Sequence, residues 1–195
     1  DLPTNVYPLF AQALRKEEKK TAATHLDECS ALFSEFSKIA SKNPYSWFPS
    51  YRSPAEIAEE TTNNRMVGFP YTKYLNSVIR VNMASAFILM SQGKADELNV
   101  AENKRVYVHG CSILNDIWNV TERPDFHSSP AIKTCVNQSL DQADISLSDI
   151  KHFDLYSCFP SAVQIAKKEL GIPEEKKDLT VTGGLPYFGG PGNSY

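Results

Sequence analysis

Glycines gather near the end of this chain and restrict how its backbone can run there. Five of the nine glycines lie between residues 183 and 192 of the 195-residue sequence. Glycine accepts positive φ and lets a backbone approach a ligand closely, so this stretch favours turns over a helix or a central strand. It fits neither GxxxxGK(S/T) nor GxGxxG, and therefore does not predict nucleotide binding. Two readings stay open: amides aimed at a carbonyl or oxyanion, or tight turns between strands.

A cysteine about twenty residues earlier lies where a strand is expected to lead into a helix. Residues 153–156 have the pattern of a strand, and the helix after them should begin at Pro160 or Ser161 and end at Leu170. Cys158 falls between the two, where α/β proteins often place ligand-facing groups. Amides at a helix N-terminus favour a thiolate there. The alternative is a buried cysteine that serves as a small hydrophobic residue.

The order of the expected elements predicts an α/β fold. Strands are expected in the latter part of residues 78–90 and at 105–110, 153–156 and 179–182. Helices are expected at 24–40, 54–60, 93–98, from 130 to about 140, and 160–170. The first helix has a capping-box-like start at Thr24 and Asp27, and Ser53 with Glu56 predicts another capping box. Strands that alternate with helices predict a mostly parallel sheet covered by helices.

An aromatic segment at residues 43–51 holds four aromatic residues and two prolines, so it predicts an ordered loop. Such a loop either lines a ligand pocket or is pinned to the body of the protein by its own side chains. The sequence alone leaves both readings open.

Composition argues against several classes of partner. Twenty basic and twenty-three acidic residues give a net charge of −3, and no basic stripe predicts nucleic acid binding. The longest apolar run, residues 84–90, is too short to cross a bilayer, and no signal-peptide pattern is present, so we expect no membrane partner and a cytoplasmic location. The four cysteines and four histidines form no CxxC, HxxxH or HExxH pattern, and neither a metal nor a bound cofactor is expected.

Several motifs resemble those of sterol-carrier-type thiolases. Residues 154–159 (DLYSCF) resemble the His-Asp-Cys-Phe motif, and residues 182–191 resemble the segment from Ser-Gly-Gly to Gly-His-Pro. Residues 81–86 look like the alanine-rich strand that closes the N-terminal thiolase half, and residues 43–46 resemble an Asn-Pro-Tyr-Ser sequence of the loop domain. The resemblance implies an incomplete α/β, thiolase-like layered fold, with helices packed on mostly parallel mixed sheets.

The resemblance also implies a division of the chain. Residues 1–77 would be a loop-domain segment, 78–100 the last strand and helix of the N-terminal half, and 101–195 the beginning of the C-terminal half. Because the chain opens without Met at Asp1 and stops after a glycine-rich turn, we expect a piece of a larger protein.

The implied activity is that of an acetyl-CoA acetyltransferase of lipid metabolism, which condenses or thiolytically cleaves acyl-CoA thioesters. Cys158 matches the family's acid/base that handles the proton at the α-carbon, whereas the family's nucleophilic cysteine would lie upstream of Asp1. The coenzyme A thioester is then a substrate. The expected partners are acyl-CoA and either further copies of the chain or a thiolase-like subunit, and we expect the 195 residues alone to be inactive.

Two departures from the motifs bear on this expectation. Tyr156 replaces the motif histidine that helps to form an oxyanion hole, and Gly190 replaces the histidine that activates the nucleophile. A tyrosine hydroxyl can still donate a hydrogen bond, but glycine has no group that accepts a proton. Candidate oxyanion and substrate-binding residues are Tyr156, Gly183, Gly184, Gly189 and Gly190.

Two other functions remain open. One is a non-catalytic thiolase-like subunit that binds acyl-CoA or a partner chain. The other is a cysteine hydrolase in which Cys158 pairs with His109, His127 or His152.

Overall fold

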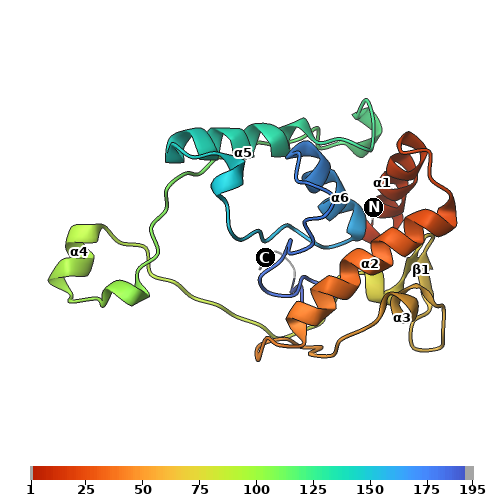
Figure 1. The fold of residues 1–195 in the computed structure, drawn as a ribbon, viewed down its shortest axis with the longest axis horizontal. Coiled ribbons are helices and arrows are strands. Elements are labelled where there is room, and N and C mark those ends of the chain that lie inside the picture. The colour runs from red at the N-terminus through yellow and green to blue at the C-terminus, as the bar shows by residue number, and fades with distance from the viewer. Residues whose placement is uncertain (1, 192–195) are drawn as a thin grey trace.

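The computed structural model describes residues 2–191, and Figure 1 shows their fold. The helices are α1 (Pro3–Glu17), α2 (Ala22–Ala40), α3 (Pro54–Ala58), α4 (Gln92–Glu97), α5 (Pro130–Ala143) and α6 (Pro160–Glu169). The strands are β1 (Met66–Gly68) and β2 (Tyr71–Thr72). Four 3-10 turns complete the elements: η1 (Lys73–Leu75), η2 (Glu102–Lys104), η3 (Val120–Glu122) and η4 (Leu147–Asp149).

Helix α2 is the central helix of the core. Leu26, Cys29, Phe33, Phe36 and Ala40 recur at helical spacing, which predicts an apolar stripe; the last four are fully buried and Leu26 is half-buried, so the stripe is confirmed. Its predicted start is wrong: the N-cap is Thr21, whose side-chain oxygen accepts a hydrogen bond from the Thr24 amide at 3.1 Å. The N-cap therefore lies three residues earlier than predicted, since a threonine that is followed by residues able to continue the helix can cap it without a carboxylate at the third position.

Helix α1 was not expected from the sequence. Pro8 lies inside it and interrupts the apolar pattern, yet Phe10, Ala11 and Leu14 are buried. The helix packs against α6, and Tyr7 and Phe159 stack with ring centroids 4.5 Å apart. Tertiary packing thus stabilises a helix whose sequence pattern is weak.

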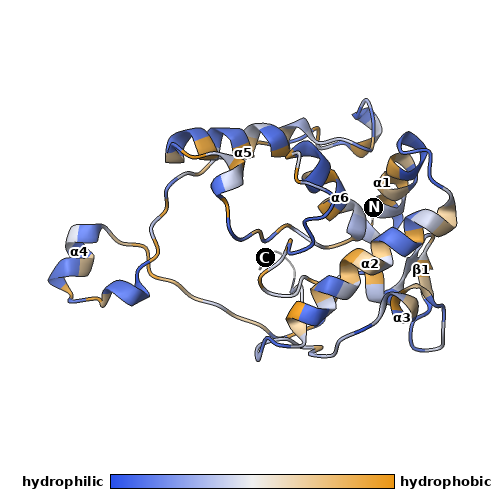
Figure 2. Ribbon diagram, viewed as in Figure 1, coloured by the Kyte–Doolittle hydropathy of each residue, from blue (hydrophilic) through white to orange (hydrophobic). Residues whose placement is uncertain are grey.

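The main core joins residues from both ends of the chain. It contains α2 residues, Ile57, Tyr71 and Leu75 together with Cys158, Phe159, Val163, Leu179 and Tyr187. Figure 2 shows hydrophobic and hydrophilic residues alternating along α2, as expected for a helix with one buried side. Segments 1–77 and 151–191 therefore share one core, and the division into thiolase-like domains stays a prediction.

Two smaller helix predictions meet different outcomes. The capping box at Ser53 and Glu56 is confirmed, and it starts the short α3. The sequence also predicts a buried face of Ile132, Cys135, Val136 and Leu140 on the helix that starts at residue 130; in α5 these four side chains are only half-buried, because the helix lies at the edge of the core.

The strands differ most from expectation. The described residues form one sheet, the antiparallel pair of β1 and β2, in which Met66 faces Thr72 and Gly68 faces Tyr71. The segments predicted as strands form no ladder within residues 2–191. Residues 153–156 and 179–182 touch through a hydrogen bond from the Leu155 amide to the Leu179 carbonyl at 2.9 Å. An apolar pattern favours extended backbone but cannot supply the neighbouring strand that a ladder requires.

A long excursion leaves the body between residues 77 and 119, with α4 near its far end (Figure 1). Its hydrophobic side chains face solvent: Phe87 is 88% exposed and Val106 is 94% exposed. Arg105 stabilises the far end by pairing with Asp96 and by donating to the Val100 carbonyl. The excursion is therefore held locally, with little contact to the core.

No helix within residues 2–191 is long and apolar enough to cross a membrane.

Candidate functional site

Cys158 lies immediately before helix α6, as the sequence predicts. Phe159 is the N-cap residue of α6, with extended backbone, and Pro160 is the first helical residue. The Cys158 carbonyl accepts a hydrogen bond from the Ser77 amide at 3.0 Å, which ties this turn to the start of the excursion. Cys158 is 4% exposed, so the thiol lies just below the surface.

Two tyrosines act on the pKa of the Cys158 thiol. Tyr156 comes from the same motif and is 45% exposed, whereas Tyr7 comes from α1 and is half-buried. The tyrosine at the position of the family's histidine is therefore next to the thiol. Sequence analysis missed Tyr7, because nothing in the local pattern shows that α1 packs on the turn before α6.

The electrostatics of the thiol follow from burial opposed by hydrogen bonds. Burial raises the pKa of Cys158 above its ordinary value, and hydrogen bonds from Tyr7, Tyr156 and the Phe159 amide partly oppose that rise. Burial also raises the pKa of Tyr7, and the nearby thiol adds to the rise. The two tyrosines thus stay protonated, and their hydroxyls remain able to donate to a thiolate.

The first part of the glycine stretch is packed tightly against α2 and the Cys158 turn. Gly183 has φ +112°, and a Cβ there would come within 2.4 Å of the Ala40 Cβ. A Cβ on Gly184 would meet the Ser157 Oγ at 2.8 Å. The Ser157 hydroxyl also accepts a hydrogen bond from the Leu185 amide at 3.1 Å, so the turn and the motif are held together.

The later glycines pack against the start of the excursion. Gly189 and Gly190 are buried, and the Gly190 amide donates to the Val78 carbonyl at 2.9 Å. A Cβ on Gly189 would come within 2.6 Å of the Met83 sulfur. Close packing accounts for these glycines, and their contact with a ligand stays a prediction.

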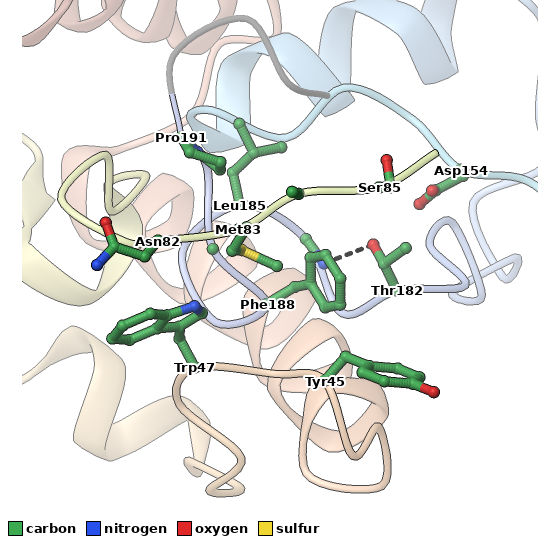
Figure 3. Close-up of a pocket in the computed structure, with 13 residues that line it drawn as sticks. Tyr45, Trp47, Asn82, Met83, Ser85, Asp154, Thr182, Leu185, Phe188 and Pro191 are labelled. Carbon is green, nitrogen blue, oxygen red and sulfur yellow. Dashed lines mark hydrogen bonds between the residues drawn. The ribbon is translucent and has the colours of Figure 1, made fainter. Parts of the chain in front are cut away.

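A cavity of about 640 Å³ lies beside the glycine turn, as Figure 3 shows. It is bounded by the aromatic loop, the chain around Met83 and the glycine turn. The loop is joined to the turn by a hydrogen bond from the Trp47 amide to the Phe188 carbonyl at 3.1 Å. The lining residues are Tyr45, Trp47, Asn82, Met83, Ala84, Ser85, Asp154, Thr182, Gly184, Leu185, Phe188, Gly189 and Pro191.

The cavity and the thiol are separate features. Cys158 is not among the residues that line the cavity, although the lining residue Leu185 is tied to the neighbouring Ser157. Asp154 of the motif does line it, and its carboxylate accepts hydrogen bonds from the Thr180 hydroxyl at 2.8 Å and the Val181 amide at 3.2 Å. The aromatic loop therefore lines a pocket and is also pinned to the body.

Within the described part of the chain, no hydrogen bond joins His109, His127 or His152 to the Cys158 thiol. His127 instead lies 3.8 Å from the carboxylates of Glu17 and Asp125. The arrangement gives no support to the cysteine hydrolase hypothesis.

A different cysteine does contact a histidine. In α2 the Cys29 sulfur lies 3.6 Å from the His25 Nε2 and 3.8 Å from the Gln164 side-chain oxygen. The signal in the sequence is the spacing of four residues on one helix face. Burial raises the pKa of Cys29 and lowers that of His25, so both groups are neutral and the contact belongs to the core.

Comparison with known proteins finds similarity among solved structures. No family model and no curated protein matches the chain. Among solved structures, the chain is similar to a monomeric SCP2-thiolase like protein type 1 from Mycobacterium smegmatis, with 36% sequence identity and a TM-score of 0.85. The match covers 97% of this chain and 42% of that chain. This similarity confirms the expected α/β, thiolase-like fold, and the chain spans less than half the length of the protein it matches.

Proposed function

We propose that this chain supplies the acid/base part of a thiolase-like acyl-CoA acyltransferase of the acetyl-CoA acetyltransferase type. The observation that carries the proposal is the position of the Cys158 thiol, which lies just below the surface, immediately before α6, at the motif position. The similarity to an SCP2-thiolase like protein supports the same assignment. The substrate is a coenzyme A thioester, and the group that carries the acyl chain would come from outside these residues.

The proposed chemistry is a proton transfer at the α-carbon of the thioester. In condensation the Cys158 thiolate takes this proton, and the resulting enolate attacks the acyl carbonyl carbon and displaces the group that carries the acyl chain. In cleavage that group bonds to the acyl carbon as the carbon–carbon bond breaks; the electrons of the broken bond pass to the α-carbon, to which the thiol donates its proton. Because burial raises the thiol pKa, the protonated form that cleavage requires is favoured near neutrality.

The Tyr156 hydroxyl can serve only one acceptor at a time. It has one proton, which it donates either to the Cys158 sulfur or to a thioester oxygen. Burial and the nearby Cys158 thiol raise the pKa of Tyr156, so its hydroxyl keeps that proton. An oxyanion role for Tyr156 would therefore require the substrate to compete with the thiolate for the same donor.

The direct test replaces Cys158 in the complete protein. We expect Cys158→Ala to lower acyl-CoA turnover by about two to four orders of magnitude, the usual contribution of an acid/base group. Cys111→Ser is the matched control, because Cys111 is an exposed free cysteine. Equal turnover in the Cys158→Ala variant and the unchanged protein would overturn the assignment.

A second candidate function is a non-catalytic thiolase-like subunit that binds acyl-CoA or a partner chain. Gly190 favours it, because this residue offers no side chain where the resembling motif has the activating histidine. The cavity beside the glycine turn, with Trp47 and Phe188 in its wall, supports binding of an apolar group. Calorimetric binding of an acyl-CoA with no turnover across a broad panel would favour this function, and turnover would exclude it.

A further inference from the structure

Ser157, the residue before Cys158, is fully buried and its hydroxyl faces the glycine turn. The Ser157 Oγ accepts a hydrogen bond from the Leu185 amide at 3.1 Å, a contact between residues 28 positions apart. A Cβ on Gly184 would come within 2.8 Å of the same oxygen. The glycine therefore leaves free the space that the serine hydroxyl needs, and the two segments fit each other closely.

The chain at residues 77 and 78 closes a ring of hydrogen bonds around this contact. The Ser77 amide donates to the Cys158 carbonyl at 3.0 Å, and the Val78 amide donates to the Leu185 carbonyl at 3.3 Å. Together with the bond from Leu185 to Ser157, these bonds join three segments that are distant in sequence. The two bonds from residues 77 and 78 use backbone groups on both sides, which a side-chain substitution leaves in place. The Ser157 hydroxyl supplies the link of the ring that a substitution can remove.

The ring connects the residue that carries the thiol to a wall of the cavity. Leu185 lines the cavity, as Figure 3 shows, and its backbone is held by the ring through both its amide and its carbonyl. Its side chain is also confined, because a Cβ on Gly190 would lie 2.8 Å from the Leu185 Cδ2. The position of this wall relative to Cys158 therefore depends on the ring.

Burial makes the Ser157 link hard to replace. Leu185 is 4% exposed, so water does not readily take the place of a lost acceptor for its amide. A buried amide without an acceptor costs more than the hydrogen bond itself contributes, and the turn lowers this cost only by opening to solvent. Loss of the hydroxyl should therefore loosen the turn at residues 157 and 158 rather than leave it unchanged.

We infer that Ser157 is a positioning residue: its hydroxyl closes the ring that fixes Cys158 relative to the Leu185 wall of the cavity. The consequence for catalysis rests on the proposed function, in which the thiol must stay aligned with a thioester. The effect on the position of Cys158 does not depend on that function.

The test is the Ser157→Ala variant of the complete protein, with the alkylation of individual cysteines by iodoacetamide followed by peptide mass spectrometry. Cys158 is 4% exposed, so the reagent reaches it when the turn opens locally. We expect the rate at Cys158 to rise about tenfold in the variant. Cys29 of α2 is fully buried in the same core and reports global opening, so its rate should rise much less.

Ser161→Ala is the matched control. Ser161 lies in the first turn of α6 and is also fully buried, but its hydroxyl has no hydrogen-bond partner among residues 2–191. Removal of such a hydroxyl leaves no donor or acceptor newly unpaired, so we expect an unchanged alkylation rate at Cys158. The exposed Cys111 serves as an internal reference in every sample.

Three alkylation results would overturn the inference: an unchanged Cys158 rate in Ser157→Ala, an equal rise at Cys29 and Cys158, or an equal effect of Ser161→Ala. If Ser157→Ala folds poorly, hydrogen exchange in the unchanged protein gives a second test, read from overlapping peptides that end on either side of Leu185. The Leu185 amide should be protected as strongly as the Val78 amide, although its acceptor is a side chain. Exchange of the Leu185 amide as fast as in an unfolded peptide would also overturn the inference, whereas full turnover in Cys158→Ala would refute only the proposed function.

Discussion

Gly183 connects the glycine turn to the central helix at the level of a single residue. Its φ of +112° is unfavourable for residues with a side chain, and a Cβ there would lie 2.6 Å from the Ala40 Cα. Because backbone atoms cannot move aside as a flexible side chain can, any substitution must shift the turn. The turn also holds the Leu185 amide on Ser157, next to Cys158, so stability and site geometry should change together.

We expect Gly183→Ala to lower the free energy of unfolding by about 2 kcal/mol or more, through backbone strain and overpacking. Gly93→Ala is the control, because Gly93 lies in α4 and a Cβ there meets nothing within 4 Å. That change should leave stability unchanged or slightly higher. Urea denaturation measures both, and equal effects at the two glycines would contradict the packing argument.

At the scale of elements, α2 shows why the position of a helix cap matters. The Thr21 side-chain oxygen accepts from the Thr24 amide, and the two hydroxyls also lie 2.9 Å apart. The preceding Lys20 pairs with Glu18 and Glu28, which fixes the turn between α1 and α2. The end of α2 that meets α1 is thus stabilised by a cap and by charges close to the surface.

Alanine substitutions at Thr21 and Thr24 test which of the two residues is the N-cap of α2. We expect Thr21→Ala to cost about 1 kcal/mol of stability, the usual loss for a threonine N-cap. Thr24→Ala removes a hydroxyl but leaves the capped amide in place, so it should cost clearly less. If denaturation curves gave Thr24→Ala the larger loss, the helix would start where the sequence predicts.

The elements also show what the sequence could and could not predict. Helices with a strong local signal were found: the stripe of α2, the capping box at Ser53 and the start of α6 all depend on neighbouring residues. Helix α1 was missed, because Pro8 breaks its pattern and its stability comes from contact with α6. The expected strands were not paired, because pairing depends on a partner that a local pattern does not identify.

The candidate site, too, could be predicted only in part from the sequence. The position of Cys158 before a helix follows from local pattern, and the motif resemblance indicated the same residue. The stack of Tyr7 on Phe159, next to Cys158, joins residues at opposite ends of the chain, and such a contact is specified only once α1, α2 and α6 pack together. The cavity is likewise formed by three distant segments; the sequence suggested the aromatic loop and the glycine stretch as binding segments, but not the chain around Met83.

For the whole molecule, the contrast between the packed body and the excursion is the main feature. Phe87, Ile88 and Leu89 are all strongly exposed. Among the described residues, no amide of residues 79–90 donates a backbone hydrogen bond. Exposed apolar chain with free amides resembles an unprotected sheet edge, which is stabilised when another strand pairs with it. The body, in contrast, fully buries Cys29, Phe33, Phe36 and Ala40 of α2.

Hydrogen exchange should therefore divide the 195-residue chain into three classes. Amides of residues 79–90 should exchange almost as fast as in an unfolded peptide, because nothing protects them. Amides near α4 should be slowed only slightly, since the bond from Val100 to the Ala95 carbonyl is local and opens without disturbing the core. Amides of α2 should be the slowest, because their exposure requires global unfolding. If residues 79–90 were protected as strongly as α2, the excursion would be packed in solution, contrary to this prediction. If these amides exchanged slowly in a longer chain but fast in the 195-residue chain, residues beyond these 195 would cover the excursion.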